Sequence, residues 1–134
     1  MIRQLDANTL VGGQIAAEDV AGLKSRGVTM IVNNRPDGED EGQPTGADIE
    51  QAAEAAGITY RHIPINRGIG PADVESMREA IDACDGKLLA YCRSGTRSTL
   101  AWAVAKRQQG ATVEELNEAA ASAGIDLGPV AHLL

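Results

Sequence analysis

The sequence predicts an α/β fold, namely a single-domain three-layer sandwich with a mainly parallel central sheet. Short runs rich in Val, Ile and Leu alternate with longer segments in which apolar residues recur at helical spacing. Glycine or proline separates most of these segments, as expected at the ends of helices and strands. The 134 residues, 43% of them hydrophobic, suffice to bury one core, so we expect residues 1–134 to form one domain.

The first half of the chain alternates helices with buried strands. In chain order we expect a helix over 17–26, a strand over 28–33, a helix over 47–56 and a strand over 58–65. The run 28–33 is mainly apolar and β-branched, which suits a strand covered on both faces. Gly27 and Gly57 end the two helices, and several glycines and prolines keep the polar segment 34–46 irregular.

The second half repeats this pattern after the glycine-rich turn 66–70. In chain order we expect a helix over 71–84, a strand over 88–91, a helix over 100–109 and a helix over 113–123. Pro71 fits the first turn of its helix, where its missing N–H costs no hydrogen bond. The tail 125–134 has no clear pattern and is left unassigned.

Charge and cysteine content limit the partners and the compartment. The net charge of -7 and the pI near 4.7 argue against nucleic acid or an anionic membrane as a partner. With two cysteines, no secretory leader and no apolar run of roughly 18 residues, we expect a cytoplasmic protein without a disulfide framework. No metal site is indicated, and we expect no cofactor. A small anionic substrate therefore requires local positive charge.

That local charge lies in the run 92–98, which reads Cys-Arg-Ser-Gly-Thr-Arg-Ser and connects a strand to a helix. At such a position the backbone N–H groups of a helix N-terminus converge on one point and bind an anion. Arg93 and Arg97 add two full charges. Together these groups favour a thiolate at Cys92, with a pKa in the range of roughly 3.5 to 7.5 instead of about 8.5. We therefore predict that Cys92 is a reactive nucleophile.

Each remaining residue of the run has a predicted part in binding the anion. Gly95 lets the backbone curl, and the Ser98 hydroxyl is placed to bind the thiolate or to cap the helix. Arg97 offers a planar fork for two oxyanion oxygens. The alternative is a buried, inert cysteine, but the arginines and hydroxyl residues beside it are costly to place without an anion. Ser94 and Thr96 complete the set of predicted anion-binding loop residues.

Two other residues have alternative interpretations. Cys84, without a cation beside it, is a core residue or a resolving thiol for oxidised Cys92. His62 is a core or sheet-edge histidine, because it has no partner at metal-ligand spacing.

Over most of residues 1–110 the chain resembles the bacterial phosphatase-like domain that occurs alone or joined to beta-lactamase-type hydrolases and is sometimes labelled a sulfur transferase. The residues that carry the resemblance are the segments 31–39, 43–44, 60–65 and 91–98. The resemblance implies a fold similar to dual-specificity and other cysteine-based phosphatases. It implies that Cys92 is the nucleophile, that Arg97 binds the oxyanion and that 93–96 form the backbone cradle. It also implies a beta-lactamase-type hydrolase or a dioxygenase as a partner.

The sequence departs from ordinary cysteine phosphatases in two respects. Four residues, not five, separate Cys92 from Arg97, and this spacing resembles that of rhodanese sulfurtransferases. The general-acid aspartate of the family is also missing after the strand 58–65, where Asn66 begins the turn. Loss of a general acid costs typically 10² to 10⁴ in rate for poor leaving groups, so aryl esters are the favoured phosphate substrates.

The segment after the strand 28–33 supplies two further candidates. Asp37 is a candidate general acid, because loops at the carboxyl ends of parallel strands share one rim; the alternative is a turn residue before Gly38. Arg35 is a further anion contact, or it pairs with the acidic run 39–41. That acidic run is itself expected to be a solvated loop face.

These features favour a cysteine-dependent, phosphatase-like hydrolase that acts on a phosphorylated substrate, with aryl esters favoured. The alternative is a rhodanese-type sulfurtransferase that carries a persulfide on Cys92 and takes sulfur from a sulfane-sulfur donor. A second alternative is a non-catalytic module that binds an anion or senses thiol oxidation.

Overall fold

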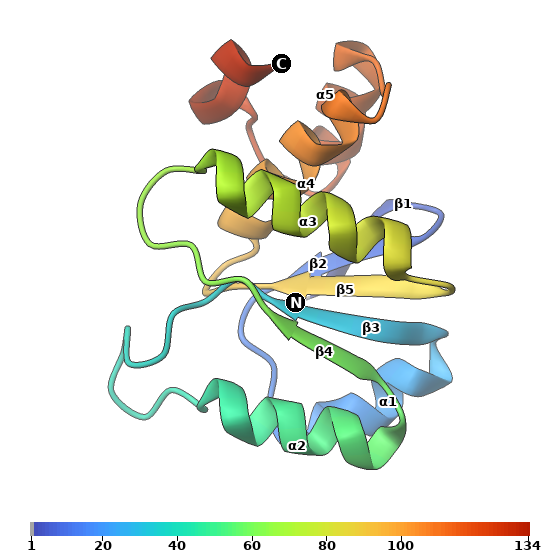
Figure 1. Ribbon diagram of the computed structural model, residues 1–134, viewed down its shortest axis with the longest axis vertical. Coiled ribbons are helices and arrows are strands. Elements are labelled where there is room, and N and C mark those ends of the chain that lie inside the picture. Colours follow the sequence, from blue (N-terminus) through green and yellow to red (C-terminus); the bar gives the residue numbers. More distant parts are fainter. Residues whose placement is uncertain (1) are drawn as a thin grey trace.

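The structure, a computed structural model, describes residues 2–134. Its five strands form one sheet in the order β1-β2-β5-β3-β4 (Figure 1). The strands are β1 (Ile2–Asp6), β2 (Thr9–Gly12), β3 (Val28–Asn33), β4 (Thr59–His62) and β5 (Lys87–Tyr91). All neighbouring pairs are parallel except β1 and β2, which form an antiparallel hairpin. The predicted mainly parallel sheet is confirmed.

Helices cover both faces of this sheet, which confirms the three layers (Figure 1). They are α1 (Val20–Ser25), α2 (Gly46–Ala56), α3 (Pro71–Ala83), α4 (Thr96–Gln108) and α5 (Val113–Ser122), with 3₁₀ helices at Ala17–Asp19 and Gly128–Leu133. α1 and α2 lie on one face, α3 and α4 lie on the other, and α5 packs against α4. Within residues 2–134 no helix has the length and apolar character needed to cross a lipid bilayer.

Strand β5 is the centre of the sheet and separates two hydrophobic cores. Leu88 and Ala90 face the core beneath α3 and α4, whereas Leu89 and Tyr91 face the core beneath α1 and α2. All four side chains are at most 2% exposed. Full burial of a leucine contributes roughly 1.5–3 kcal/mol relative to exposure, so this strand is held firmly from both sides.

Three differences from the sequence prediction exceed two residues. The hairpin of β1 and β2 was not assigned, and β4 ends at His62 instead of residue 65. α4 begins at Thr96, four residues before the predicted start at 100. Because of this earlier start, Arg97 and Ser98 belong to the first helical turn and not to the preceding loop.

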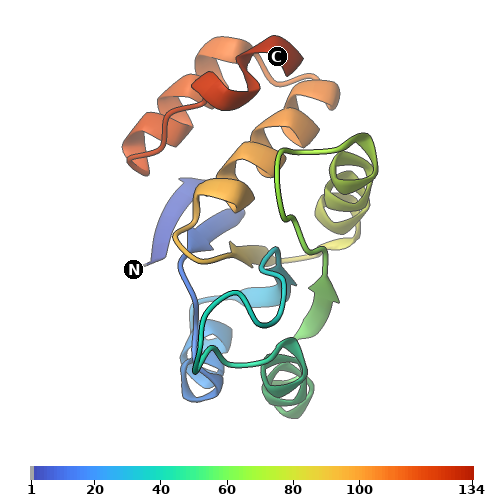
Figure 2. The same ribbon diagram turned by 90° about the vertical axis from the view of Figure 1, so that its left-hand side faces the viewer.

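The parallel strands β3, β4 and β5 bring three loops to one edge of the sheet. Asn33 is in register with His62 of β4 and with Tyr91 of β5, so the segments that follow these strands start side by side. Figure 2 shows this edge facing the viewer, with the loops after β3 and β5 next to each other. The carboxyl ends of parallel strands are where α/β proteins bind ligands.

Candidate active site

Cys92 follows β5 directly and is fully buried. Its backbone N–H donates to the carbonyl oxygen of Gly12 in β2, at 3.3 Å, which extends the pairing of β2 and β5 by one residue. The chain then turns so that the amide nitrogen of Gly95 lies 3.1 Å from the Cys92 sulfur. The predicted arrangement of strand, tight loop and helix is therefore present around Cys92.

Glycines make this tight turn feasible. Gly95 has φ of +94°, a left-handed conformation that other residues adopt only with strain. Gly13 lies so close to the loop that a Cβ atom there would be 2.9 Å from the carbonyl oxygen of Arg93. A side chain at Gly13 would thus displace the loop from β2.

The surroundings of Cys92 favour its thiolate form. Burial by itself raises the pKa of the Cys92 thiol, but hydrogen bonds from the loop outweigh this effect and leave the pKa below its ordinary value. The lowering comes from the backbone amide of Ser98, the amide of Ser94, the Ser98 hydroxyl and the amide of Gly95. A larger fraction of thiolate at any given pH is the chemical consequence.

Arg97 faces this sulfur with one edge of its guanidinium open. Nη1 donates to Glu39 Oε2 at 2.6 Å and to the Ile65 carbonyl oxygen at 2.7 Å, and Nη2 donates to Glu39 Oε1 at 2.8 Å. Within residues 2–134 no oxygen accepts a hydrogen bond from Nε or from the second Nη2 hydrogen, and the guanidinium interacts with the Cys92 sulfur instead. These two N–H groups form the kind of fork that binds two oxygens of an oxyanion. The hydrogen bonds with Glu39, and then the negative charge of Cys92, raise the pKa of Arg97.

Glu39 is a site residue that the sequence analysis missed. We expected the run 39–41 to be a solvated face, but only 25% of the Glu39 side chain is exposed, and it binds both Arg97 and Arg35. The hydrogen bond from Arg97, aided by Arg35 and opposed by burial, lowers the pKa of Glu39 to about 2. No local pattern signals this role, because Glu39 and Arg97 are 58 residues apart.

Arg35 takes the second of its two predicted roles. Its side chain is only 4% exposed, and its guanidinium donates to Glu39 at 2.9 Å, Asp40 at 2.7 Å and Gln14 at 3.1 Å. The carbonyl oxygen of Arg35 lies 2.9 Å from His62 Nε2 on the edge strand β4, which is the predicted sheet-edge position of that histidine. Arg35 thus pairs with the acidic run and braces the loop after β3.

The remaining predicted loop residues lie nearer the surface. Arg93 Nε is 3.1 Å from Asp40 Oδ2, and its side chain is 68% exposed. The hydroxyl oxygens of Ser94 and Thr96 are 3.2 Å apart. The four ion pairs within residues 2–134 all join Glu39 or Asp40 to an arginine of this site.

Asp37 accepts a hydrogen bond from the backbone N–H of Gly46, at 2.8 Å, where α2 begins. Within the described residues no hydrogen bond or ion pair joins Asp37 to Cys92 or Arg97. Its role as a general acid remains a prediction, and the contact with Gly46 gives the residue a structural role.

Ser98 and Asn34 form the buried floor of the site. Both are fully buried, and the Ser98 hydroxyl donates to Asn34 Oδ1 at 2.8 Å. Asn34 was not predicted as a site residue, because its sequence position shows only that it begins the polar segment after an apolar strand. The topology alone brings it under the first turn of α4.

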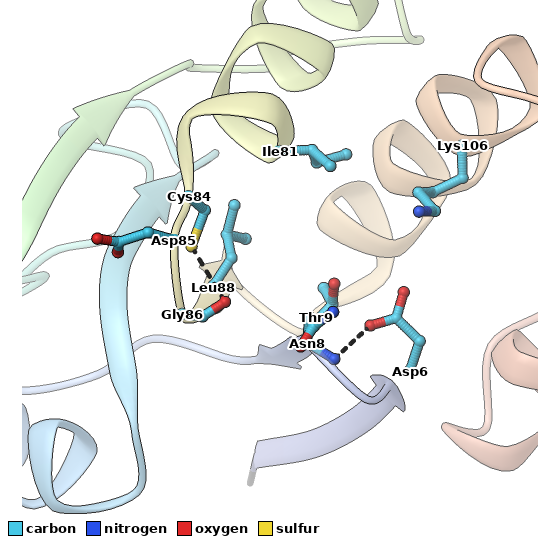
Figure 3. A pocket seen from close by; sticks show the side chains of 9 residues that line it. All are labelled: Asp6, Asn8, Thr9, Ile81, Cys84, Asp85, Gly86, Leu88 and Lys106. Atoms are coloured by element: carbon cyan, nitrogen blue, oxygen red, sulfur yellow. Dashed lines mark hydrogen bonds between the residues drawn. The ribbon is translucent and has the colours of Figure 1, made fainter.

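Cys84 lies at the opposite end of β5 from Cys92. Figure 3 shows its side chain between Asp85 and Leu88, in a cavity whose other lining includes Lys106 and Asp6. Seven residues separate the two cysteines, and the five of them that form β5 alone span about 16 Å at roughly 3.3 Å per residue. A disulfide requires Cα atoms at most about 7 Å apart, so Cys84 does not serve as a resolving thiol within one chain.

Comparison with known sequences gives a consistent result. The family described as "Beta-lactamase hydrolase-like protein, phosphatase-like domain" matches residues 1–111. A beta-lactamase hydrolase-like protein of Xylella fastidiosa is 35% identical over 130 residues, which are 95% of this chain and 30% of that protein. The chain thus spans about a third of the length of this relative. One from Agrobacterium fabrum is 31% identical over 108 residues, or 80% of this chain and 25% of that protein.

Solved structures agree on the fold. A candidate phosphatase from Neisseria meningitidis superposes with a TM-score of 0.82 at 36% identity, covering 95% of this chain and 91% of that one. Kinase-associated phosphatase, in a form whose catalytic-site cysteine is replaced by serine, gives a TM-score of 0.72 at 19% identity. That match covers 93% of this chain and 83% of the phosphatase. The expected likeness to dual-specificity phosphatases is confirmed for the fold.

Proposed function

The chain belongs to the family of phosphatase-like domains of beta-lactamase hydrolase-like proteins, and from this premise we propose that it is a phosphatase whose nucleophile is Cys92. The observation that carries the proposal is the convergence of three backbone amides on the Cys92 sulfur, beside the open edge of Arg97. Thiolate, amide donors and a free guanidinium fork are together the groups that bind and attack a phosphate monoester.

In the first step the Cys92 sulfur attacks phosphorus. An S–P bond forms while the P–O bond to the organic group breaks, and the oxygen of the leaving group departs with the electron pair. The amides of Ser94, Gly95 and Ser98 and the open edge of Arg97 would hold the three non-bridging oxygens. In the second step the oxygen of a water molecule forms a bond to phosphorus while the S–P bond breaks, its electron pair returns to sulfur, and inorganic phosphate leaves with the proton of the water on the phosphate or released to solvent.

The leaving group defines the substrate class. Asp37 accepts a hydrogen bond from the backbone N–H of Gly46. The carboxylates of Glu39 and Asp40 form ion pairs with the arginines of the site. Unless Asp37 acts as the predicted general acid, a leaving oxygen departs without a proton donor at the site, which favours aryl phosphates over alkyl phosphates. We therefore propose aryl phosphates as the substrate class.

The decisive experiment compares p-nitrophenyl phosphate with an alkyl phosphate for the wild type, Cys92→Ser and the matched control Cys84→Ser. We expect turnover of the aryl ester alone, lost by at least about 10³-fold in Cys92→Ser, as for other covalent nucleophiles. Cys84→Ser should keep the wild-type rate, because Cys84 lies at the far end of β5. Full activity in Cys92→Ser would refute the nucleophile.

A second candidate function is sulfur transfer, which the four-residue spacing from Cys92 to Arg97 favours. Here the Cys92 thiolate would take the outer sulfur of thiosulfate, releasing sulfite, and the persulfide would pass that sulfur to cyanide as thiocyanate. The same variants should be assayed with thiosulfate and cyanide. Thiocyanate formation without phosphate release would replace the phosphatase proposal, and inactivity in both assays would favour an anion-binding module.

A further inference from the structure

A groove of about 400 Å³ lies beside the Cys92 loop. The loop residues 93–96 form one side of it, and the end of β2 and the segment 123–125 after α5 form the other. Figure 2 shows the loop after β5 next to the hairpin of β1 and β2. Gly95 lines the groove, and its amide nitrogen lies 3.1 Å from the Cys92 sulfur, so the groove and the nucleophile share one loop. The volume is in the range of small-molecule sites.

The lining of this groove is positively charged. Arg3 of β1 and Arg93 of the loop line it, whereas no Asp or Glu within residues 2–134 does. Three other cavities of the described chain each include an aspartate or a glutamate. The absence of carboxylates here is notable in a chain that has 19 acidic residues against 12 basic ones. A groove lined by one sign of charge attracts a ligand of the opposite sign, so the lining indicates an anionic ligand.

Arg3 is held at this groove by the backbone and not by a carboxylate. Its Nη1 donates to the carbonyl oxygen of Ala123. Gly124 leaves the space for this contact, because a Cβ atom there would collide with Nη1. Among residues 2–134 Arg3 forms no ion pair, so its charge is not neutralised. A guanidinium anchored through one nitrogen has its remaining donors ready for an oxyanion.

Arg93 and two hydroxyl groups supply further donors. The Nε of Arg93 is 3.1 Å from Asp40 Oδ2, and its two Nη groups have no acceptor in the part of the chain that the structure describes. The hydroxyl groups of Ser94 and Thr96, 3.2 Å apart, belong to the same lining. The groove thus offers both charge and neutral hydrogen-bond donors to an anion.

Arg3 is too far from Cys92 for one phosphate group to contact both. Arg3 of β1 is in register with Val11 of β2, and Val11 is in register with Ala90 of β5. Neighbouring strands are about 4.8 Å apart, so β1 and β5 are separated by about 10 Å. A ligand that reaches both places needs two anionic groups with a spacer, such as an aryl ring, between them.

We propose that this groove binds a second anionic group of the substrate, and that the preferred substrate is an aryl phosphate whose leaving group carries a second negative charge. The inference rests on the proposed function, in which the phosphate binds beside Cys92. Arg3 and Arg93 would determine specificity by binding the second anion. They take no part in the steps that make and break bonds to phosphorus.

The test compares 4-carboxyphenyl phosphate with its neutral isostere 4-carbamoylphenyl phosphate. Isothermal titration calorimetry measures the binding of each to Cys92→Ser, and to that variant with Arg3→Gln, Arg93→Gln or Arg78→Gln added. We expect Cys92→Ser to bind the carboxylate about tenfold more tightly than the amide, the effect of one charge-assisted hydrogen-bonded pair. Arg3→Gln and Arg93→Gln should each reduce this preference by roughly threefold or more, as for partly exposed ion pairs.

Arg78→Gln is the matched control. Arg78 is an exposed arginine of α3 that does not line the groove, and its replacement changes the net charge by the same amount. It should therefore leave the preference unchanged. Higher salt should weaken the preference, because the groove is open to solvent.

Equal affinities for the two ligands in Cys92→Ser would overturn the proposal, as would a preference that Arg78→Gln weakens as much as Arg3→Gln does. If Arg3→Gln does not fold, Arg93→Gln decides the question, because it leaves the contact of Arg3 with Ala123 intact. Binding without a preference would refute the second anion site and leave the proposed function standing. Failure to bind either ligand would refute the proposed function and this inference with it.

Discussion

The carboxylate of Glu39 accepts hydrogen bonds of 2.6 and 2.8 Å from one edge of the Arg97 guanidinium. The other edge of the guanidinium faces the Cys92 sulfur. The guanidinium is planar, so fixing one edge also fixes the direction of the other. Glu39 is thus placed to orient the anion-binding fork without touching the anion.

Replacing Glu39 should therefore weaken catalysis. We expect Glu39→Gln to reduce kcat/KM for p-nitrophenyl phosphate by roughly 10- to 100-fold, the usual cost of a misplaced catalytic group. Inhibition by inorganic phosphate should weaken in parallel, because the same fork binds product. Glu41→Gln is the matched control, being an exposed neighbour without an ion pair within residues 2–134. Equal activity in the two variants would exclude a positioning role for Glu39.

The same residue should make stability depend on pH in the acid range. The pKa of Glu39 is about 2 in the folded chain and about 4.3 when unfolded, so the unfolded chain binds the extra proton between these values. Its ion pairs stabilise the fold fully above about pH 4.3 and lose this effect as pH falls toward 2. The Tm difference between wild type and Glu39→Gln should accordingly be largest near neutrality and narrow in acid. A difference that stays constant down to pH 2 would contradict the low pKa.

The thiol of Cys92 should be more acidic in the folded chain than in the unfolded chain. In the Cys84→Ser variant, the apparent pKa for iodoacetamide alkylation should lie below about 8.5 in buffer and near that value in urea. The reason is that the loop amides that lower the pKa converge only in the fold. A folded value at or above the unfolded one would show that burial outweighs the hydrogen bonds.

Two glycine substitutions should have opposite effects on stability. Gly95→Ala should cost about 1–2 kcal/mol, because residue 95 adopts a left-handed conformation. Gly22→Ala should stabilise by about 0.5–1 kcal/mol, since this position is helical and a Cβ there meets nothing within 4 Å. Urea unfolding with an unchanged m-value measures both. Stabilisation by Gly95→Ala would mean that the turn tolerates another conformation.

Much of the fold was predictable because most helices and strands are determined by the residues within them and at their ends. The run 28–33 became β3 with the predicted bounds. A short continuous run of apolar, β-branched residues is typical of a strand that is buried on both faces. Gly57 ended α2 as expected, with φ of +74°. The hairpin of β1 and β2 was missed because β1 is a short edge strand whose Arg3 and Gln4 are exposed and do not mark a buried strand.

The site was predictable only in part, because some of its residues are far apart in the sequence. Cys92 and Arg97 stand in one short run, and that run identified them. Glu39 and Asn34 reach the same place from the segment after β3, at separations of 58 and 64 residues from their partners. Only the pairing of β3 with β5 brings these residues together, and side-chain composition gives no sign of it.

The position of Cys92 also bears on how the protein loses its reactivity. Cys92 continues the central strand, and its amide donates to the Gly12 carbonyl oxygen on one side while the Asn34 amide donates to the Tyr91 carbonyl oxygen on the other. Segments anchored in this way exchange their amide hydrogens by global unfolding more than by local opening. Heat or denaturant should therefore return the pKa of the Cys92 thiol to its ordinary value and melt the sheet in one cooperative transition.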